Sequence, residues 1–261
     1  MKFKIPFRNK RPTVCVVHLT GIITSGRGLN DQSAGPMLEK AFAKKPDAVA
    51  LVINSPGGSP VQSSLIGSRI RRLAEEKEVP VYAFVEDVAA SGGYWLAVCA
   101  DEIYVDQGSI TGSIGVISSG FGLHDFICNY GIERRVYTAG TSKSQLDPFQ
   151  PEKKEDVKRL KGILDDIHDV FKSHVTERRG DKLVDRDLFT GEIWVGAKAI
   201  EDGLVDGVGH VVPKMKELFG DKVRFRVFGP KKRFTSRFGL NIVDDAAHKI
   251  EERAAYAQFG L

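Results

Sequence analysis

The 261-residue sequence predicts an α/β fold with repeated βαβ units and a mostly parallel central sheet. Segments rich in Val and Ile alternate with amphipathic segments at least three times, which is typical of parallel strands joined by right-handed crossovers. The segment Ala48–Ile53 is apolar at every position, as expected for a strand that is buried on both faces of the sheet. A hydrophobic fraction of 42% and a charged fraction of 28% are ordinary for a folded enzyme.

The strands are recognised by β-branched and apolar residues that end at turn signals. The second strand, for example, ends at Asn54–Pro60, whose sequence NSPGGSP is a dense turn signal. Strands are expected over residues 13–24, 48–53, 79–85, 102–105, 134–138 and 222–227.

The helices are recognised by apolar residues three and four positions apart, as at Ile66, Ile70 and Leu73. Helices are expected over residues 35–45, 61–76, 94–99, 120–130, 152–178 and 241–258, with a compact turn-helix-turn segment over residues 187–209. The last helix is amphipathic, with charged residues between its apolar positions.

The chain is long enough to bury a sizeable core, and no convincing boundary divides it. We therefore expect a single domain over residues 13–228. A basic segment at residues 1–12 precedes it, and residues 229–261 add a second basic segment and the amphipathic helix.

The net charge of +4 is unevenly distributed. The first 11 residues carry five positive charges and residues 231–237 carry four, so the rest of the chain has a net charge of −5. This pattern disfavours a uniformly basic nucleic-acid surface, and no nucleic-acid partner is expected. Both basic segments contain Phe, at Phe3 and Phe7 and at Phe234 and Phe238. They form the basis of a hypothesis of peripheral contact with an anionic membrane.

Other classes of protein are excluded by missing patterns. No run of 18 apolar residues predicts a transmembrane helix, and no apolar segment typical of a signal peptide follows the basic start. A cytoplasmic location is expected, peripheral to the inner membrane if the basic ends bind lipid. Cys15, Cys99 and Cys128 are too scattered for a disulfide framework, and the six histidines show no metal-ligand spacing. No metal and no cofactor are predicted.

Three glycine-containing loops follow predicted strands, at residues 54–60, 89–93 and 110–115. Loops at the carboxyl ends of parallel strands build the sites of open α/β sheets. The second loop places Ser91 at the start of a helix, where a serine most often only caps the helix. The pattern differs from the GxSxG turn of α/β-hydrolases, because Ala89 stands where the first glycine would be.

The loops together resemble the signal peptide peptidase A family of serine proteases, whose fold is similar to the Clp-protease/crotonase fold with β-β-α units. The resemblance covers about residues 13–228. The segments that carry it are Asn54–Gly58, Ala90–Trp95, Gly108–Val116, Ser142–Phe149, Thr190–Trp194 and Gly203–Asp206.

The resemblance implies a Ser–Lys dyad. Ser91 would be the nucleophile, Lys143 the general base, and Ser113 the residue that orients the lysine. A serine hydroxyl needs such a base, and a lysine becomes one at neutral pH only if its surroundings lower its pKa from about 10.4 to about 7–8. The amides of Gly58 and Gly92 would form the oxyanion hole. Contacts with the substrate are expected at Gly57, Ser59, Ile114 and Gly115.

The resemblance also implies partners. Peptides with small or hydrophobic residues, such as released signal peptides, are the expected substrates, and a homo-oligomer is expected because the dyad can form across subunits in this family. Two alternatives stay open. One is a crotonase-like acyl-CoA enzyme, which would need a carboxylate in the loops; the other is an inactive scaffold that binds peptides or membrane proteins.

The end of the chain allows two interpretations. The segment Ala255–Ala257 has the small-residue pattern of a processing site, so the tail could enter the groove of the enzyme itself. The favoured expectation is that the terminal helix packs on a neighbouring subunit.

Overall fold

The computed structural model describes residues 11–140, 142–229 and 242–261. The chain forms two compact units. The first comprises residues up to Ile114 together with His174–Leu261, and the second comprises Gly115–Ser173. The basic, Phe-bearing segments at residues 1–10 and 230–241 lie outside the described residues.

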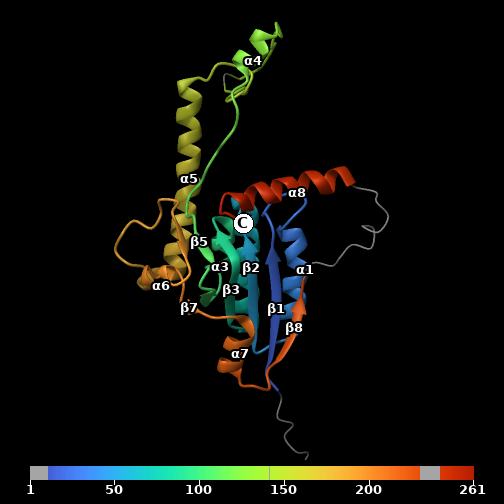
Figure 1. The fold of residues 1–261 in the computed structure, drawn as a ribbon, viewed down its shortest axis with the longest axis vertical. Coiled ribbons are helices and arrows are strands. Elements are labelled where there is room, and N and C mark those ends of the chain that lie inside the picture. The colour runs from blue at the N-terminus through green and yellow to red at the C-terminus, as the bar shows by residue number, and fades with distance from the viewer. Residues whose placement is uncertain (1–10, 141, 230–241) are drawn as a thin grey trace, which may run out of the picture. The chain divides into compact units, whose positions relative to one another are not determined.

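The first unit is built on one sheet with the strand order β6-β5-β3-β2-β1-β8, in which β4 pairs with β3 and β7 (Figure 1). Neighbouring strands are parallel except for the antiparallel pair β5–β6. The predicted α/β class with a mostly parallel sheet is thereby confirmed. The strands are β1 (Thr13–Thr20), β2 (Ala48–Ser55), β3 (Val81–Ala90), β4 (Glu102–Val105), β5 (Ile110–Gly112), β6 (Ile193–Val195), β7 (Gly207–Val208) and β8 (Arg224–Phe228).

Helices pack on the sheet and across its edge. The helices of this unit are α1 (Asp31–Phe42), α2 (Pro60–Lys77), α3 (Gly92–Ala97), α6 (Lys198–Glu201), α7 (Val211–Phe219) and α8 (Ile242–Ala257), together with the last turns of α5 (Lys154–Arg179). A capping box between Asn30 and Ser33 starts α1 four residues earlier than its apolar pattern indicates. In Figure 1, α8 runs across the carboxyl ends of the central strands.

The core lies on both faces of the sheet. On one face, Met215 of α7 packs with alternate residues of the strands, among them Val14, Ala50 and Phe84. The central strands β1 and β2 are buried almost throughout, which explains their nearly continuous apolar sequence. The positions of their carboxyl ends are therefore fixed by extensive burial, and the loops of interest begin there.

The second unit contains α4 (His124–Asn129) and most of α5. The strand predicted over residues 134–138 is wrong, because the structure forms no strand there and four of the five residues are exposed. A strand needs a neighbour that satisfies its backbone N–H and C=O groups, and solvent does so here. Among the described residues, no helix is both long and apolar enough to cross a membrane.

Candidate active site

Ser91 occupies a strained turn between β3 and α3. Its φ of 51° and ψ of −121° lie in a region that non-glycine residues rarely adopt, and such strain clusters at functional sites. Although Ser91 holds the N-cap position of α3, its side chain makes no capping hydrogen bond. The hydroxyl is therefore not used for helix capping, which was the commoner expectation for this serine.

The loop of Gly57 and Gly58 lies directly against Ser91. A Cβ atom on Gly57 would lie 2.7 Å from the amide nitrogen of Gly92 and 2.8 Å from the Cβ of Ser91. Gly57 also has a φ of 98°, so both conformation and space require glycine. The sheet thus brings together two loops that lie about 35 positions apart in the sequence.

The same contacts leave two backbone donors near Ser91. The Ile23 amide donates to the Gly57 carbonyl at 2.8 Å, and the Ile23 carbonyl accepts from the Ser59 amide at 2.7 Å. Neither bond involves Gly58, which lies between these two partners. Within the described parts of the chain, the amides of Gly58 and Gly92 make no hydrogen bond. Gly92 is the first residue of α3, where helical amides lack a partner in their own helix. Two unpaired N–H groups beside a serine can bind a negatively charged oxygen.

Ser113 follows the strand that neighbours the one leading to Ser91. Ala90 pairs with Gly112 in the parallel β3–β5 register, and the Ser91 amide donates to the Gly112 carbonyl at 2.8 Å. Ser113 also has a φ of 51°, and its amide donates to the carbonyl of Glu192 at 2.6 Å. The two serines thus stand side by side at the ends of adjacent strands.

The segment Thr190–Trp194 braces this arrangement from the antiparallel strand β6. A Cβ atom on Gly112 would lie 2.3 Å from the ring of Trp194, so only glycine fits there. The indole nitrogen of Trp194 donates to Asp202 at 2.6 Å, which fixes the ring. The segment Thr190–Trp194 therefore supports the end of β5, which Ser113 follows directly.

The segment Gly203–Asp206 anchors α3. The Tyr94 hydroxyl, in the first turn of this helix, donates to the Leu204 carbonyl at 2.7 Å and is fully buried. Arg179 donates to the Gly203 carbonyl and, at 2.7 Å, to Asp206. Burial alone would raise the pKa of Asp206, but hydrogen bonds from Arg179, Lys182 and the Ile103 amide lower it on balance. This network holds the helix whose N-terminus carries Ser91.

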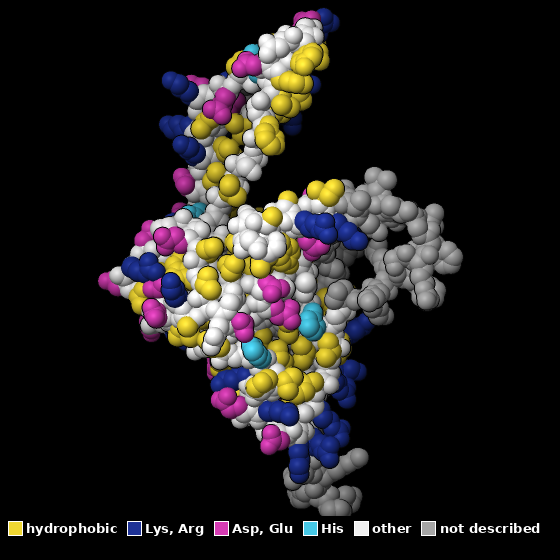
Figure 2. Space-filling view, viewed as in Figure 1, with side chains coloured by type: hydrophobic (Ala, Val, Ile, Leu, Met, Phe, Trp, Pro, Cys, Tyr) yellow, Lys and Arg dark blue, Asp and Glu magenta, His cyan; other side chains and the backbone are white. Residues whose placement is uncertain are grey.

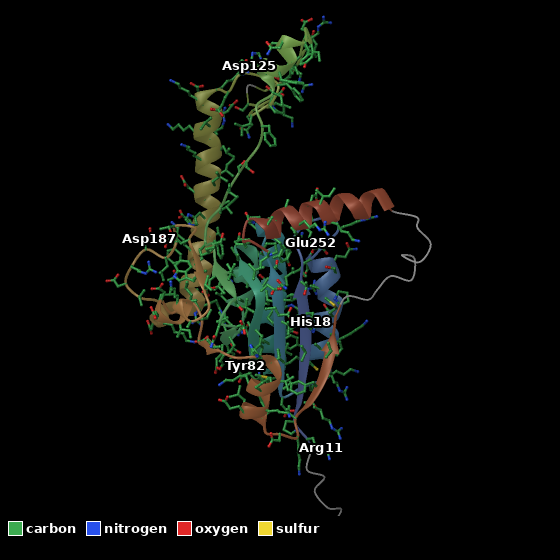
Figure 3. All side chains as sticks on the ribbon, viewed as in Figure 1. Arg11, His18, Tyr82, Asp125, Asp187 and Glu252 are labelled. Atoms are coloured by element: carbon green, nitrogen blue, oxygen red, sulfur yellow. The ribbon has the colours of Figure 1, made fainter. Side chains whose placement is uncertain are left out.

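A further contact comes from α8. The Tyr256 hydroxyl donates to the Asn54 carbonyl at 2.7 Å, at the start of the glycine loop. The side chain of Asn54 in turn donates to Asp87 of β3 at 2.6 Å. Burial and the nearby Glu252 carboxylate raise the pKa of Tyr256 to about 12, so its hydroxyl stays protonated. Figure 3 places Glu252 on α8 above the end of β1, and a Cβ on Gly21 would lie 2.9 Å from its carboxylate.

These contacts went unrecognised in the sequence. Arg179 and Tyr256 carry no local signal, since each acts on a residue far away in the chain. Asp206 stands in a recognised motif, but the motif does not reveal its partner.

The other predicted site residues are distributed as follows. Lys143 lies in a turn of the second unit and is exposed. Ser59 caps α2 by accepting from the Gln62 amide at 3.4 Å, and Ile114 is buried at the end of the first unit. Gly115 begins the second unit. The first unit thus brings together Ser91, Ser113 and the three glycines, while Lys143 belongs to the other unit.

Comparison with known proteins identifies the family. The model of peptidase family S49 matches residues 73–220, more than half of the chain. A Brucella melitensis protein named Na(+)/H(+) antiporter NhaA is 46% identical over 98% of this chain, and the match covers 38% of that protein. A putative signal peptide peptidase SppA of Enterococcus faecium is 30% identical over 67% of this chain and 51% of its own length. This chain therefore spans about half of these relatives or less.

A solved structure shares the fold. The 1510-N membrane-bound stomatin-specific protease, in complex with a substrate peptide, superposes with a TM-score of 0.54 at 15% identity. The match covers 90% of this chain and 99% of that one. Together with the family match, this likeness confirms the resemblance inferred from the glycine loops: the chain belongs to peptidase family S49 and is similar to signal peptide peptidase A.

Proposed function

We propose that this chain is a serine endopeptidase that uses Ser91 as nucleophile and Lys143 as general base. The observation that carries the proposal is the strained, uncapped Ser91 beside the unpaired amides of Gly58 and Gly92. A structural serine at a helix start would be expected to cap the helix in a relaxed conformation. Membership of peptidase family S49 also supports the proposal that the chain is a peptidase.

The proposed reaction has two steps. The Ser91 Oγ attacks the carbonyl carbon of the scissile peptide bond and gives its proton to the Lys143 Nζ, while the amides of Gly58 and Gly92 stabilise the oxyanion. The C–N bond then breaks, and the lysine returns the proton to the leaving amine. Water cleaves the acyl-enzyme by the same route, releasing the second product and restoring the serine. Ser113 would orient the lysine.

We also propose a homo-oligomer. Lys143 is exposed in its own unit, whereas a lysine base must be shielded from water. Large apolar side chains are exposed in the same unit, as expected for a surface that another copy covers. Among them are Ile117, Phe121, Phe126, Tyr130, Ile132 and Tyr137.

Substrates are proposed to be peptides with small or apolar residues, such as released signal peptides. The name of the Enterococcus faecium relative supports this class of substrate.

We also propose that the protein acts at a membrane surface. The Brucella melitensis relative, a longer protein that is named for a membrane transporter, supports this location. The proposed contact is made by the basic ends, and co-sedimentation with anionic liposomes, with and without residues 1–11, tests it. Equal, negligible binding of both forms would rule it out.

The proposed reaction is tested by hydrolysis of an apolar peptide thioester. We expect Ser91→Ala and Lys143→Ala to lose activity, whereas Lys153→Ala, a matched change at another lysine of the second unit, keeps it. Full activity of Ser91→Ala or Lys143→Ala would overturn the dyad.

Mixing the two inactive variants shows where the dyad forms. Recovery of part of the activity means that Ser91 and Lys143 come from different subunits. A stably inactive mixture, after subunit exchange has been verified, means that one chain supplies both.

The alternatives make different predictions. A crotonase-like acyl-CoA enzyme would carry a carboxylate in the loops, where this chain has Ser91 and glycines. An inactive scaffold would bind peptides without cleaving them in any of these assays.

A further inference from the structure

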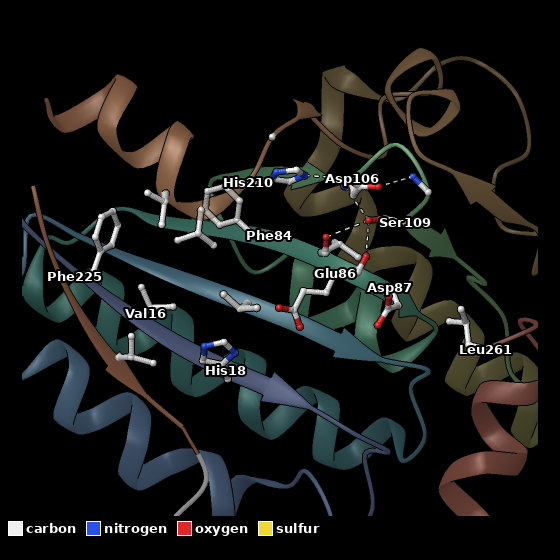
Figure 4. A pocket seen from close by; sticks show the side chains of 17 residues that line it. Val16, His18, Phe84, Glu86, Asp87, Asp106, Ser109, His210, Phe225 and Leu261 are labelled. Atoms are coloured by element: carbon white, nitrogen blue, oxygen red, sulfur yellow. Dashed lines mark hydrogen bonds and ion pairs between the residues drawn. The ribbon is translucent and has the colours of Figure 1, made fainter. Parts of the chain in front are cut away.

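A pocket of about 840 Å³ lies on the sheet face that carries α7 (Figure 4). The α7 helix packs on this face through Met215, which shares one apolar cluster with Val16, Val52 and Phe84. These three residues are each at most 5% exposed and form the floor of the pocket. All residues that line it belong to the first unit.

The walls of the pocket are apolar and open to solvent. Val227 of β8 is 66% exposed, Val212 of α7 is 50% exposed, and Leu261 is 51% exposed. An apolar side chain that enters the pocket would remove these surfaces from water, which is favourable in proportion to the area buried.

The rim on the β3 side is acidic. Glu86, Asp87 and Asp106 line the pocket, and no Lys or Arg stands among the described residues of its lining. Asp106 pairs with His210 at 2.9 Å, and Asp87 accepts from Asn54, so among the described side chains Glu86 is the carboxylate of this rim that forms no hydrogen bond or ion pair. Figure 2 shows acidic and histidine side chains of this face beside hydrophobic ones.

We propose that this pocket binds a peptide segment that combines an apolar residue with Lys or Arg. The apolar floor selects the first feature, and the carboxylates select the second by charge complementarity. A neutral apolar partner would leave the Glu86 carboxylate without a counter-ion, and an acidic partner would be repelled.

The position of the pocket links it to the proposed protease site. Glu86 lies on β3, five residues before Ser91, where the register of β3 against β2 shifts and the strand is shorter than a regular extended chain. A bound substrate would therefore carry its basic residue within about five positions of the bond that is cleaved. This part of the inference rests on the proposed function, whereas binding itself does not.

Binding is tested on the full-length Ser91→Ala variant, so that no cleavage is needed. Fluorescence anisotropy compares labelled Leu/Ala peptides that end in a pair of lysines, serines or glutamates. We expect the lysine peptide to bind most tightly and the glutamate peptide most weakly, with differences that shrink at high salt. Equal affinity for all three would overturn the proposal.

Two substitutions locate the binding. Glu86→Gln is expected to weaken binding of the lysine peptide about fivefold, as for the loss of one partly exposed charge pair. It should leave the affinity for the serine peptide unchanged. Glu75→Gln, an exposed glutamate of α2, is the matched control and should change neither. Val227→Asn, which makes this wall polar without adding a charge, should weaken both peptides. An unchanged affinity in Glu86→Gln and Val227→Asn would overturn the proposal.

The assay also separates other occupants. If Val227→Asn dissociates an oligomer while peptide affinity stays constant, the pocket is a contact between copies of this chain and the proposal is wrong. Binding that persists when wild type cleaves no peptide would support the pocket and contradict the proposed protease.

Discussion

The hydroxyl of Tyr256, in the last turn of α8, donates a hydrogen bond of 2.7 Å to the backbone carbonyl of Asn54. The two residues are 202 positions apart, and Asn54 begins the loop that holds Gly57 and Gly58 against Ser91. The terminal helix thus packs on its own chain, at the glycine loop. The sequence alone favours packing on a neighbouring subunit.

This contact predicts an effect of Tyr256→Phe on the loop. The ring remains, but the loop loses a donor, and the free energy of unfolding should fall by about 1 kcal/mol. A looser loop aligns the Gly58 amide less well with the oxyanion. The kcat should therefore fall about fivefold, which corresponds to about 1 kcal/mol in the activation free energy. Peptide hydrolysis measures the kcat, and unfolding in urea measures the free energy of unfolding. The control is Tyr137→Phe, a side chain that is 90% exposed, and equal kinetics of the two variants would contradict the role of Tyr256.

Gly57→Ala should abolish most activity, because the added methyl group would collide with Ser91 and Gly92. We expect a loss of at least 10²-fold in kcat, as for a lost oxyanion-hole donor. The control is Gly220→Ala, which shares the positive φ, at 85°, but has open space around it. It should lose about 1–3 kcal/mol of stability, because its ψ of 159° places it in a region that is essentially restricted to glycine, and it should keep its kcat. Circular dichroism establishes that both variants fold, and a folded, fully active Gly57→Ala protein would refute the packing argument.

Asp206→Asn should destabilise the fold strongly. Arg179 is 2% exposed, and the substitution would leave its charge buried without a counter-ion. We expect a loss of about 3–5 kcal/mol in the free energy of unfolding, measured with denaturant. Asp169→Asn, which breaks an ion pair with Lys172 on the surface of α5, should have no measurable effect. A change of similar size in both variants would contradict the buried role of Asp206.

His174 predicts a loss of stability in mild acid. Its ring stacks on Trp95, and burial lowers its pKa, although the Trp95 carbonyl opposes this. The unfolded chain therefore binds the proton more readily. The stabilising contribution is complete above the unfolded-state pKa of about 6.5 and is lost as the pH falls below it.

Thermal unfolding at pH 7.5 and 5.5 measures this effect. His174→Gln should show a smaller drop in Tm between the two values than wild type. His168→Gln, on the same helix, serves as control and should keep the drop of the wild type. An undiminished drop in His174→Gln would assign the acid sensitivity to other groups.

Much of the fold could be predicted from local patterns. The continuous apolar run at Ala48–Ile53 indicates a buried parallel strand, and the periodicity of Ile66, Ile70 and Leu73 indicates the helix that follows. The strand predicted at residues 134–138 was wrong because the pattern says nothing about whether a neighbouring strand is present. In the same way, β1 ends at Thr20 because Gly21 turns the chain at a φ of 98°, although the residues that follow are still strand-like.

The sequence by itself determined the fold class, the glycine loops and the family, because periodicity and short motifs are local properties of the chain. Only the tertiary structure decided that Ser91 is strained and uncapped, that Gly57 abuts it, and that Tyr256 and Arg179 support the two elements on either side. These relationships depend on the parallel register of β2, β3 and β5 and on the packing of distant segments. Side chains that act on backbone groups far along the chain leave no periodic trace in the sequence, and they become visible only when the sheet brings those groups together.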